Sequence, residues 1–489
     1  MNPMLLTDSY KLGHILQYPQ GTEFVYANFT PRSNKHFEFA PGMKSDKMVF
    51  FGLQAVIEKM VRNWDEDFFS RPFKIVYQEF MESAKNFMGD SVFPKDKMRE
   101  LHDHGCLPIR IKALPEGSLV NIRVPVFTII NTEPEFYWLT NYLETYLSAE
   151  LWKLCTSATT AHAYRQILRH WSWATGANPE FMNYQAHDFS MRGMSGCEDA
   201  ISSGAAHLTS FYGTDCIAAP SWIYDYYVQG THELPFATSV PATEHSVMCI
   251  GQENGEKETI RRLIEDVYPT GIVSIVADSW DFWKVIGQYS HELKDLIMKR
   301  NGKVVFRPDS GDPVKIICGD RDAPVGSPEY KGAVQVLWDN FGGTTNNMGF
   351  RTLNNHVGLI YGDSITMERA DEILRRLWKN GFTSDNIVFG VGSYTYQRVT
   401  RDTLGFAVKA TWGVVNGKEV EIVKCPKTDS GMKNSAAGLL RVEKEGDDYV
   451  LYDRQTREQE QQGELKVVFE DGEFHNFQSF DEIRRKLMV

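Results

Sequence analysis

Several motifs that would assign this chain of 489 residues to a common enzyme class are missing from its sequence. It has no GxxxxGK[ST] loop and no GxGxxG that opens a helix, so neither a Walker-type ATPase nor a Rossmann dehydrogenase is supported. HExxH and zinc-ribbon spacings are absent as well. The seven cysteines are scattered without a CxxC pair, which favours reduced thiols over a disulfide framework.

Long apolar runs and an excess of positive charge are also missing. No stretch approaches the roughly 18 continuous apolar residues of a membrane helix, and the N-terminus, MNPMLLTDSYKLGH, lacks a signal-peptide pattern. The net charge of −12 argues against nucleic acid or an anionic membrane as the main partner, because both attract clustered positive charge. We therefore expect a cytoplasmic protein with a sizeable core, in which a few local Arg and Lys residues could still bind a small anionic substrate.

Four apolar runs in the middle of the chain end in similar polar residues. The runs GIVSIVADS, KVVFRPDSG, VGLIYGDS and NIVFGVGS are separated by segments long enough for a helix, such as MERADEILRRLWKNG. Their ends are Ala277-Asp278-Ser279, Asp309-Ser310-Gly311, Gly362-Asp363-Ser364 and Gly392-Ser393. Because the carboxyl ends of parallel strands meet at one rim, these ends predict a shared site on a parallel barrel or sheet.

The two ends of the chain have a different pattern. Apolar residues recur at helical spacing in 48–62 and 137–153, and between them a hairpin-like segment contains the turn signal Pro115-Glu116-Gly117. After about residue 405, antiparallel hairpins are predicted, with turns at Asn416-Gly417 and Asp471-Gly472.

These patterns divide the chain into three parts. We expect a mixed α+β part at 1–154, an α/β part that carries the active site at 155–405, and a β-rich part at 406–489 that packs back on the first. The stretch REQEQQGE at 457–464 predicts a solvated loop.

The loop Arg307-Pro308-Asp309-Ser310-Gly311-Asp312-Pro313 directly follows a predicted strand and combines cationic, acidic and hydroxyl side chains. This composition indicates an anion site, with or without a metal. At Gly362-Asp363 and Gly392-Ser393, backbone N–H groups of tight turns could hold a phosphate, with Arg401 nearby in sequence, although either pair alone could be an ordinary turn.

Three further motifs offer groups for recognition or catalysis. In HDFSMRG, Phe189 could stack on a flat heterocycle and Arg192 could clamp a phosphate, although Phe189 taken alone is more typical of a core residue than of a stacking surface. Asp215 in GTD is either a ligand carboxylate or a helix cap. Glu244-His245 could supply a base, a metal ligand, a phosphoryl acceptor or a structural histidine. The residues by themselves thus indicate an α/β enzyme that handles a phosphorylated small molecule.

The order of motifs along the whole chain, TDSYK, HDFSMRG, GTD, SVPATEHS, VADSWD, RPDSGDP, GD and TRD, resembles the nicotinamide phosphoribosyltransferase family. The resemblance implies a type II phosphoribosyltransferase: an irregular α/β barrel, a mixed companion domain formed by the N- and C-terminal segments, and a homodimer with shared sites. The family transfers the phosphoribosyl group of 5-phosphoribosyl 1-pyrophosphate to nicotinamide in NAD salvage. It forms nicotinamide mononucleotide and pyrophosphate with Mg²⁺ and can couple turnover to ATP hydrolysis.

The resemblance also implies roles for single residues. Phe189 and Tyr10 of the partner subunit would stack on the two faces of the pyridine ring, and Asp215 would accept a hydrogen bond from the carboxamide and repel nicotinic acid. His245 would accept a phosphoryl group from ATP. The other residues implied in catalysis or metal binding are Glu244, Asp278, Arg307 and Asp309, the metal ligands being Asp278 and Asp309. Those implied in substrate binding are Arg192, Ser239, Ser274, Gly362, Asp363, Gly392, Ser393, Arg401, Lys409 and Lys424. Where better-known family members have a glycine series, this chain has Ser393, which narrows the phosphate turn or adds a hydroxyl donor.

Three other functions are considered. A nicotinate phosphoribosyltransferase would share the fold, and Asp215 argues against it. A barrel glycosidase or metal-dependent hydrolase could use Asp278, Asp309 and Asp363 as acid, base or ligands, but it leaves Phe189 unexplained. A non-catalytic binding or signalling protein would not need charged groups on every strand end.

Overall fold

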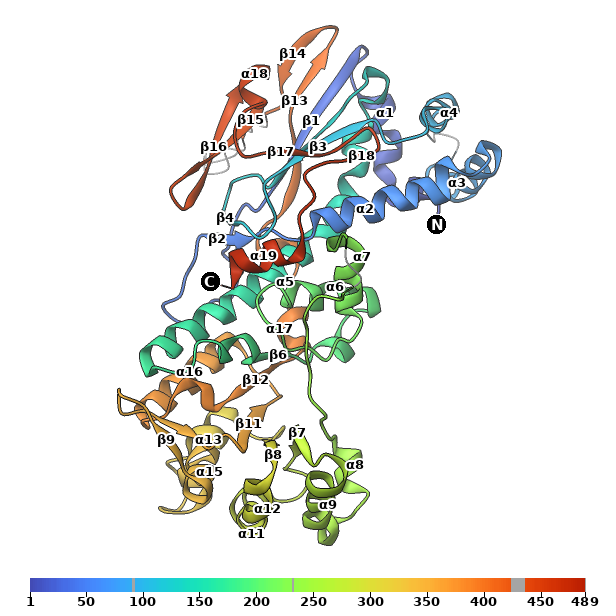
Figure 1. Ribbon diagram of the computed structural model, residues 1–489. Coiled ribbons are helices and arrows are strands. Elements are labelled where there is room, and N and C mark those ends of the chain that lie inside the picture. The colour runs from blue at the N-terminus through green and yellow to red at the C-terminus, as the bar shows by residue number, and fades with distance from the viewer. Residues whose placement is uncertain (90–92, 231–232, 424–435, 489) are drawn as a thin grey trace.

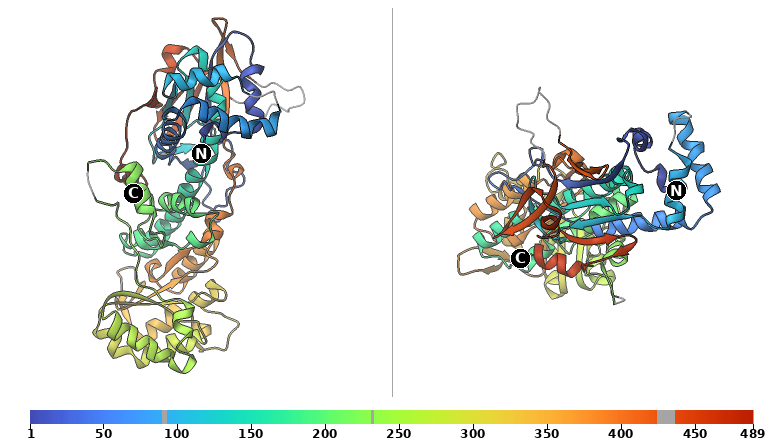
Figure 2. Two further views of the ribbon diagram at one scale, coloured as in Figure 1. Left: turned by 90° about the vertical axis from the view of Figure 1, so that its right-hand side faces the viewer. Right: turned by 90° about the horizontal axis from the view of Figure 1, so that it is seen from above.

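The computed structural model describes residues 1–89, 93–230, 233–423 and 436–488. A β-rich part contains both ends of the chain, and a second part is built around parallel strands (Figure 1). The long helix α5 (Leu139–Thr175) runs from the first part to the second. The two views of Figure 2 show that the molecule is elongated along the direction that joins the two parts.

The β-rich part, which we call the companion domain, is centred on an antiparallel sheet with the strand order β14-β13-β1-β5-β3-β17-β18. Its strands are β1 (Thr22–Thr30), β3 (Ile109–Ala113), β5 (Phe127–Asn131), β13 (Ala407–Val415), β14 (Lys418–Glu421), β17 (Lys466–Glu470) and β18 (Glu473–Phe474). The N-terminal strand β1 pairs with β13 on one side and with β5 on the other. The prediction that the C-terminal segment packs on the N-terminal part is therefore confirmed.

The expected turns are present, but one of them joins different strands than the sequence suggested. Gly117 has a φ of +79° in the turn after Pro115, yet the next strand, β4 (Leu119–Asn121), pairs with β2 (Lys47–Val49). Strand β3 pairs instead with β5. The reason is the buried Glu116 carboxylate, which accepts hydrogen bonds from the backbone N–H groups of Gly52 and Gln54 and so draws the turn toward β2 and away from the sheet.

The region 457–464 differs from its prediction as a solvated loop. The region begins with the short helix α18 (Arg457–Glu460), and the last residue of this helix, Glu460, is buried. The Glu460 carboxylate is 2.8 Å from Nζ of Lys112, which is buried as well. A run of polar letters conceals such a pair, because burial of each charge depends on a partner that is distant in the sequence.

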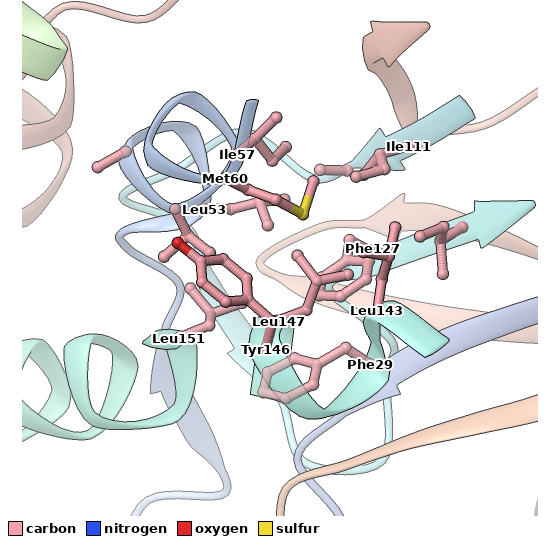
Figure 3. Close-up of a cluster of buried hydrophobic side chains, with 14 of the residues drawn as sticks. Phe29, Leu53, Ile57, Met60, Ile111, Phe127, Leu143, Tyr146, Leu147 and Leu151 are labelled. Atoms are coloured by element: carbon pink, nitrogen blue, oxygen red, sulfur yellow. The ribbon is translucent and has the colours of Figure 1, made fainter. Parts of the chain in front are cut away.

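The core of the companion domain lies between its sheet and two helices (Figure 3). Leu143, Leu147 and Leu151 of α5 repeat at helical spacing and face the sheet, as Ile57 and Met60 of α2 (Leu53–Trp64) do. The sheet contributes Phe29, Ile111 and Phe127 to this core. Burial of such side chains contributes roughly 1.5–3 kcal/mol each.

The second part contains a parallel sheet with the strand order β6-β12-β11-β8-β7. Its strands are β6 (Ala186–Asp188), β7 (Thr270–Val276), β8 (Asn301–Arg307), β11 (Val357–Tyr361) and β12 (Val388–Val391). Isolated parallel bridges join Asp188 to Thr214, Gly213 to Thr238, and Ala242 to Ser274. These bridges connect β6 back to β7 through two short extended segments, so the strands form a closed ring. The predicted irregular α/β barrel is confirmed.

Helices cover the barrel and the companion sheet. The remaining helices are α1 (His14–Gln17), α3 (Phe73–Met88), α4 (Lys95–His104), α6 (Cys197–His207), α7 (Ala219–Tyr227), α8 (His245–Cys249), α9 (Glu256–Arg262), α10 (Phe282–Lys284), α11 (Ser290–Glu292), α12 (Lys294–Lys299), α13 (Pro313–Cys318), α14 (Pro328–Lys331), α15 (Ala333–Phe341), α16 (Met367–Lys379), α17 (Ser393–Gln397) and α19 (Phe480–Leu487). The remaining short strand pairs are β9 (Gly343–Thr345) with β10 (Arg351–Leu353) and β15 (Leu439–Glu445) with β16 (Asp448–Gln455). Within the described ranges, no helix combines the length and the apolar character needed to span a bilayer.

Helix α5 belongs to two hydrophobic cores. Cys155 and Ala158 pack in the companion core, whereas Ala161 and Tyr164, within the next two turns of the helix, pack in the barrel core. The boundary that we placed between residues 154 and 155 thus falls inside a continuous helix. This helix is a structural connection between the two parts.

Candidate active site

A cleft with a volume of about 1660 Å³ lies at the carboxyl ends of the barrel strands. Ten of the residues that we predicted for the site contribute to its wall: Phe189, Arg192, Asp215, Glu244, Arg307, Asp309, Gly362, Asp363, Gly392 and Ser393. They come from the ends of β6, β8, β11 and β12 and from the loops around 215 and 244. From Phe189 to Ser393 they span more than 200 residues of the sequence.

Phe189 follows β6 and is fixed at the wall of the cleft. Its backbone N–H donates to the carbonyl of Val391, 2.9 Å away. Its ring lies directly against two glycines: a Cβ atom built at Gly390 would be 2.4 Å from Cδ2, and one at Gly362 would be 3.1 Å from Cε2. The lack of side chains at both positions leaves room for the ring beside the strand ends. Phe189 is therefore positioned as part of the site.

Asp215 presents an ionised carboxylate to the cleft. Its Oδ1 atom accepts hydrogen bonds from Nε2 of His187 at 2.9 Å and from Oγ of Ser239 at 2.7 Å. Burial by itself would raise the pKa of Asp215, but these two hydrogen bonds, the His187 charge and the more distant Arg307 lower it below its usual value. Both hydrogen bonds that the carboxylate accepts from described residues go to Oδ1, which leaves Oδ2 for a ligand.

Arg307 and Asp309 lie side by side at the end of β8. Nε of Arg307 is 3.3 Å from Oδ2 of Asp309. The other oxygen of Asp309, Oδ1, is buried and has no hydrogen-bond partner among the described residues. Burial raises the pKa of Asp309, Arg307 opposes this effect, and the nearby Asp278 carboxylate adds to it. An unsatisfied buried carboxylate oxygen is costly, so a cation or a hydroxyl group of a ligand would stabilise it.

Asp278 connects the loop after β8 with His245. Its Oδ1 atom is 3.2 Å from Nε2 of His245. Its Oδ2 atom accepts hydrogen bonds from the backbone N–H of Asp309 at 3.0 Å and from Oγ of Ser310 at 2.6 Å. The Asp278 side chain is only 4% exposed, whereas that of His245 is 50% exposed. Asp278 thus holds the imidazole; neither residue is part of the cleft wall, although Glu244, which precedes His245, is.

Three of the other predicted residues have different surroundings than their motifs suggested. Glu244 accepts a hydrogen bond from Oγ of Ser246, whereas the imidazole that follows it interacts with Asp278. Oγ of Ser393 lies against Gly193, since a Cβ atom built on Gly193 would be 2.1 Å from it. Oδ2 of Asp363 accepts a hydrogen bond from Oγ of Ser364 at 2.9 Å.

Two predicted serines line a second cavity, inside the barrel, instead of the cleft. This cavity has a volume of about 650 Å³, and Ser239 and Ser274 are part of its wall together with His187. Ser239 still reaches the cleft through its hydrogen bond to Asp215. Oγ of Ser274 is buried without a partner among the described residues.

Three other predicted residues do not line the cleft of their own chain. Tyr10 lies in the short 3₁₀ helix Ser9–Gly13 and is 58% exposed. Arg401 is exposed and 3.3 Å from the carboxylate of Asp402. Lys409 is an exposed residue of β13 in the companion sheet. Lys424 lies outside the described residues.

The metal prediction named Asp278 and Asp309. In the part of the chain that the structure describes, no group of three or more His, Cys, Asp or Glu side chains is arranged to hold a metal ion. Both oxygens of Asp278 already accept hydrogen bonds from protein groups. Asp309 fits a hard cation better, because its Oδ1 atom is buried and unsatisfied.

Sequence reasoning missed three residues that shape the site. His187 orients Asp215, Gly390 makes room for Phe189, and Ser310 holds Asp278. His187 and Ser310 belong to motifs that we had noticed, so their proximity to the chosen residues was a signal. Gly390 had a weaker signal, a small residue within the apolar run of β12.

Comparison with known proteins shows the family to which the chain belongs. The model of the nicotinate phosphoribosyltransferase (NAPRTase) family matches residues 184–473, and that of the nicotinamide phosphoribosyltransferase N-terminal domain matches residues 2–111. The chain is 53% identical to the nicotinamide phosphoribosyltransferase of Acinetobacter baylyi, with 100% of this chain and 97% of that protein covered. It is 35% identical to the protein of the same name from Mycoplasma pneumoniae, with 87% and 92% covered.

Solved structures with low sequence identity share the fold. Human nicotinic acid phosphoribosyltransferase superposes with a TM-score of 0.57 at 14% identity, covering 99% of this chain and 93% of that one. Nicotinate-nucleotide pyrophosphorylase from Pyrococcus furiosus gives 0.56 at 15% identity, covering 100% and 94%. With the family matches and the full-length relatives, the conclusion is that the chain is an enzyme of the nicotinate phosphoribosyltransferase (NAPRTase) family and belongs to its nicotinamide phosphoribosyltransferases.

Proposed function

We propose that this enzyme transfers the 5-phosphoribosyl group of 5-phosphoribosyl 1-pyrophosphate to nicotinamide, forming nicotinamide mononucleotide and pyrophosphate. The observation that carries the proposal is the pairing of Phe189 with Asp215 at one wall of the cleft. Phe189 supplies a flat apolar surface for the pyridine ring. The free oxygen of Asp215 supplies an acceptor for the carboxamide NH₂.

The charge of Asp215 discriminates between the amide and the acid. Its lowered pKa keeps it ionised at neutral pH, so the carboxylate of nicotinic acid would face a like charge and offer no hydrogen to donate. A bound ligand would shield the half-exposed Asp215 carboxylate from water, so a ligand that leaves it unpaired loses roughly 1–3 kcal/mol, and repulsion adds to that loss. Nicotinate phosphoribosyl transfer is therefore the second candidate, favoured by the name of the matching family and by those of the distant structural relatives.

Cleavage of the bond between C1 and pyrophosphate generates an oxocarbenium-like ribose, so the enzyme needs aligned reactants and neutralised leaving-group charge more than a nucleophile of its own. Arg307 and Arg192 at the cleft wall would carry positive charge to the diphosphate. Asp309 would hold the ribose hydroxyls or a Mg²⁺ ion, since its buried Oδ1 atom is unsatisfied. Mg²⁺ commonly binds one or two carboxylates plus substrate phosphates, and it would neutralise the pyrophosphate charge.

ATP coupling would use the pair of His245 and Asp278. Because Asp278 interacts with Nε2, the other nitrogen, Nδ1, is left as the acceptor of the γ-phosphoryl group, with ADP as the leaving group. The half-exposed imidazole, which follows the cleft residue Glu244 in the chain, suits transfer from a nucleotide. Asp278 would stabilise the positive charge on the ring during transfer.

A homodimer would complete the site. Tyr10, Arg401 and Lys409 carry an aromatic ring and two positive charges on exposed surfaces away from the cleft of their own chain. In a dimer these residues would supply the second face of the pyridine site and positive charge for the phosphates of the neighbouring cleft.

The test is release of pyrophosphate from 5-phosphoribosyl 1-pyrophosphate by the purified protein with Mg²⁺, measured with nicotinamide and with nicotinic acid at several concentrations. We expect kcat/KM for nicotinamide to exceed that for the acid by at least about 100-fold, the range that a hydrogen bond and a like charge can supply together. A preference for nicotinic acid would replace the proposed substrate. Absence of pyrophosphate release with both compounds would refute phosphoribosyl transfer itself.

A further inference from the structure

Two buried arginines hold the segment 208–212, which lies between α6 and the loop that contains Asp215. Nε of Arg484, in the C-terminal helix α19, donates to the carbonyl of Leu208 at 2.7 Å. Nη1 of Arg165, in α5, donates to the carbonyl of Ser210 at 3.1 Å. Arg484 is 6% exposed and Arg165 is 2% exposed. The last helix of the chain is thus anchored to the segment that leads to the proposed specificity residue.

Among the described residues, neither guanidinium group has a carboxylate as a hydrogen-bond or ion-pair partner. Arg484 interacts with a carbonyl and lies over the rings of Phe480 and Tyr212, with its Cζ atom 4.6 and 5.0 Å from their centroids. Arg165 donates to two carbonyls, those of Ser210 and Met488, and to the side chain of Asn183. Burial lowers the pKa of each arginine to about 10, so both remain charged at neutral pH. Buried charges whose hydrogen bonds go to carbonyl and amide groups are costly, and such an arrangement fixes backbone geometry at the expense of stability.

A short chain of contacts leads from Arg484 to Asp215. The Tyr212 ring lies under the guanidinium, and the Tyr212 carbonyl accepts a hydrogen bond from the backbone N–H of Thr238 at 2.8 Å. The next residue, Ser239, donates its hydroxyl to Asp215. On the other side, the backbone N–H of Asp215 donates to the carbonyl of Asp188 at 2.9 Å. Movement of Tyr212 would therefore displace one of the two donors that orient the Asp215 carboxylate.

We propose that Arg484 is a positioning residue for nicotinamide recognition: by anchoring Leu208 and Tyr212 it fixes the orientation of the Asp215 carboxylate. This inference rests on the proposed role of Asp215 in amide recognition. It assigns to the C-terminal helix a part in substrate specificity, although the helix does not line the cleft. The phosphoribosyl donor, which would be held by Arg307 and Asp309 on other strand ends, does not depend on this contact.

The test compares Arg484→Met with Arg485→Met. Methionine keeps much of the apolar stem of Arg484 but removes its charge and its hydrogen bond. Arg485 is on the same helix, is exposed, and donates only to the carbonyl of Asp481, at 3.3 Å, so it is a matched control. We expect Arg484→Met to raise KM for nicotinamide about tenfold and to lower the amide-to-acid ratio of kcat/KM about fivefold or more, as expected for a misplaced recognition group. KM for the phosphoribosyl donor should stay within about twofold in both variants.

The ratio of the two kcat/KM values does not depend on the fraction of active protein, so a purely structural role would lower the melting temperature without changing that ratio. A ratio in Arg484→Met equal to that in Arg485→Met would overturn the proposal. If Arg484→Met does not fold, Arg484→Lys, which keeps the charge but not the planar group, is judged by the same ratio. The wild-type enzyme is measured first: lack of preference for nicotinamide there contradicts the proposed function, whereas a normal wild type with an unchanged Arg484 variant contradicts only this inference.

Discussion

Substitution of Gly390 by alanine should damage nicotinamide binding by displacing the Phe189 ring, although Gly390 itself is not proposed to contact the ligand. The new Cβ atom would lie 2.4 and 2.5 Å from two carbons of the Phe189 ring and 2.8 Å from Cα of Gly362. Non-bonded carbons are most stable at about 3.5–4.0 Å, so the ring must move by about 1 Å or more. Gly362 is backbone on the neighbouring strand and cannot yield easily. The ring is therefore expected to move into the space reserved for the pyridine.

The magnitude follows from this displacement. A misplacement of about 1 Å can cost about 100-fold in rate, which corresponds to about 2.7 kcal/mol. We expect kcat/KM for nicotinamide to fall by about that factor, while overpacking lowers the free energy of unfolding by about 1–3 kcal/mol. Pyrophosphate release at varied nicotinamide concentration measures the first quantity, and urea denaturation measures the second.

Two controls make this prediction specific. Gly287→Ala is the matched control, because no described heavy atom lies within 4 Å of a Cβ atom at that glycine and its φ is not positive. If the clash acts through the Phe189 ring, Gly390→Ala should have little further effect in a Phe189→Ala background. Equal losses in both backgrounds, or a KM for nicotinamide within about twofold of wild type in the single variant, would refute the reasoning.

Four other predictions concern the roles of Asp215 and His245, the buried carboxyl group of Glu256, and the sharing of sites in a dimer. Asp215→Asn should lower the preference for nicotinamide over nicotinic acid by about tenfold or more, because repulsion of the acid is lost; an unchanged ratio in competition assays would disprove that role. His245→Ala should bring the ratio of rates with and without ATP to about one, and persistent stimulation would exclude the phosphohistidine. Glu256 is buried with a pKa raised to about 7 by burial, so the folded state keeps a proton that the unfolded state has lost, and stability falls as pH rises from about 4.5 to about 7. Glu256→Gln should remove this loss of stability. The melting temperature of the variant minus that of the wild type should therefore increase as the pH rises over that range. Parallel curves of melting temperature against pH would contradict this prediction. Inactive Tyr10→Ala and Phe189→Ala variants should regain up to about a quarter of the activity when unfolded and refolded together, because one site of each hybrid dimer is then intact; no recovery despite hybrid formation would argue against shared sites.

Sequence patterns predicted those parts of the architecture that depend on residues adjacent in the sequence. The turns at Asn416-Gly417 and Asp471-Gly472 occur as expected, with positive φ at all four residues, because these residue types tolerate left-handed backbone conformations. The partner of β4 was not predictable in this way. It depends on Glu116, whose carboxylate binds the start of α2, more than 60 residues away. The same limit applied to Glu460, whose burial depends on Lys112.

The sequence by itself determined which residue types stand at the strand ends, because a β-branched run followed by small and acidic residues is a local pattern. It also determined the family, because the order of motifs covers the whole chain. How those residues act together depends on the tertiary structure. In the folded chain His187 and Ser239 orient Asp215, two glycines make room for Phe189, and Asp278 interacts with both His245 and the loop after β8. The physical reason is that hydrogen bonds and van der Waals contacts act over a few ångströms, and closure of the barrel alone brings these distant segments within that range.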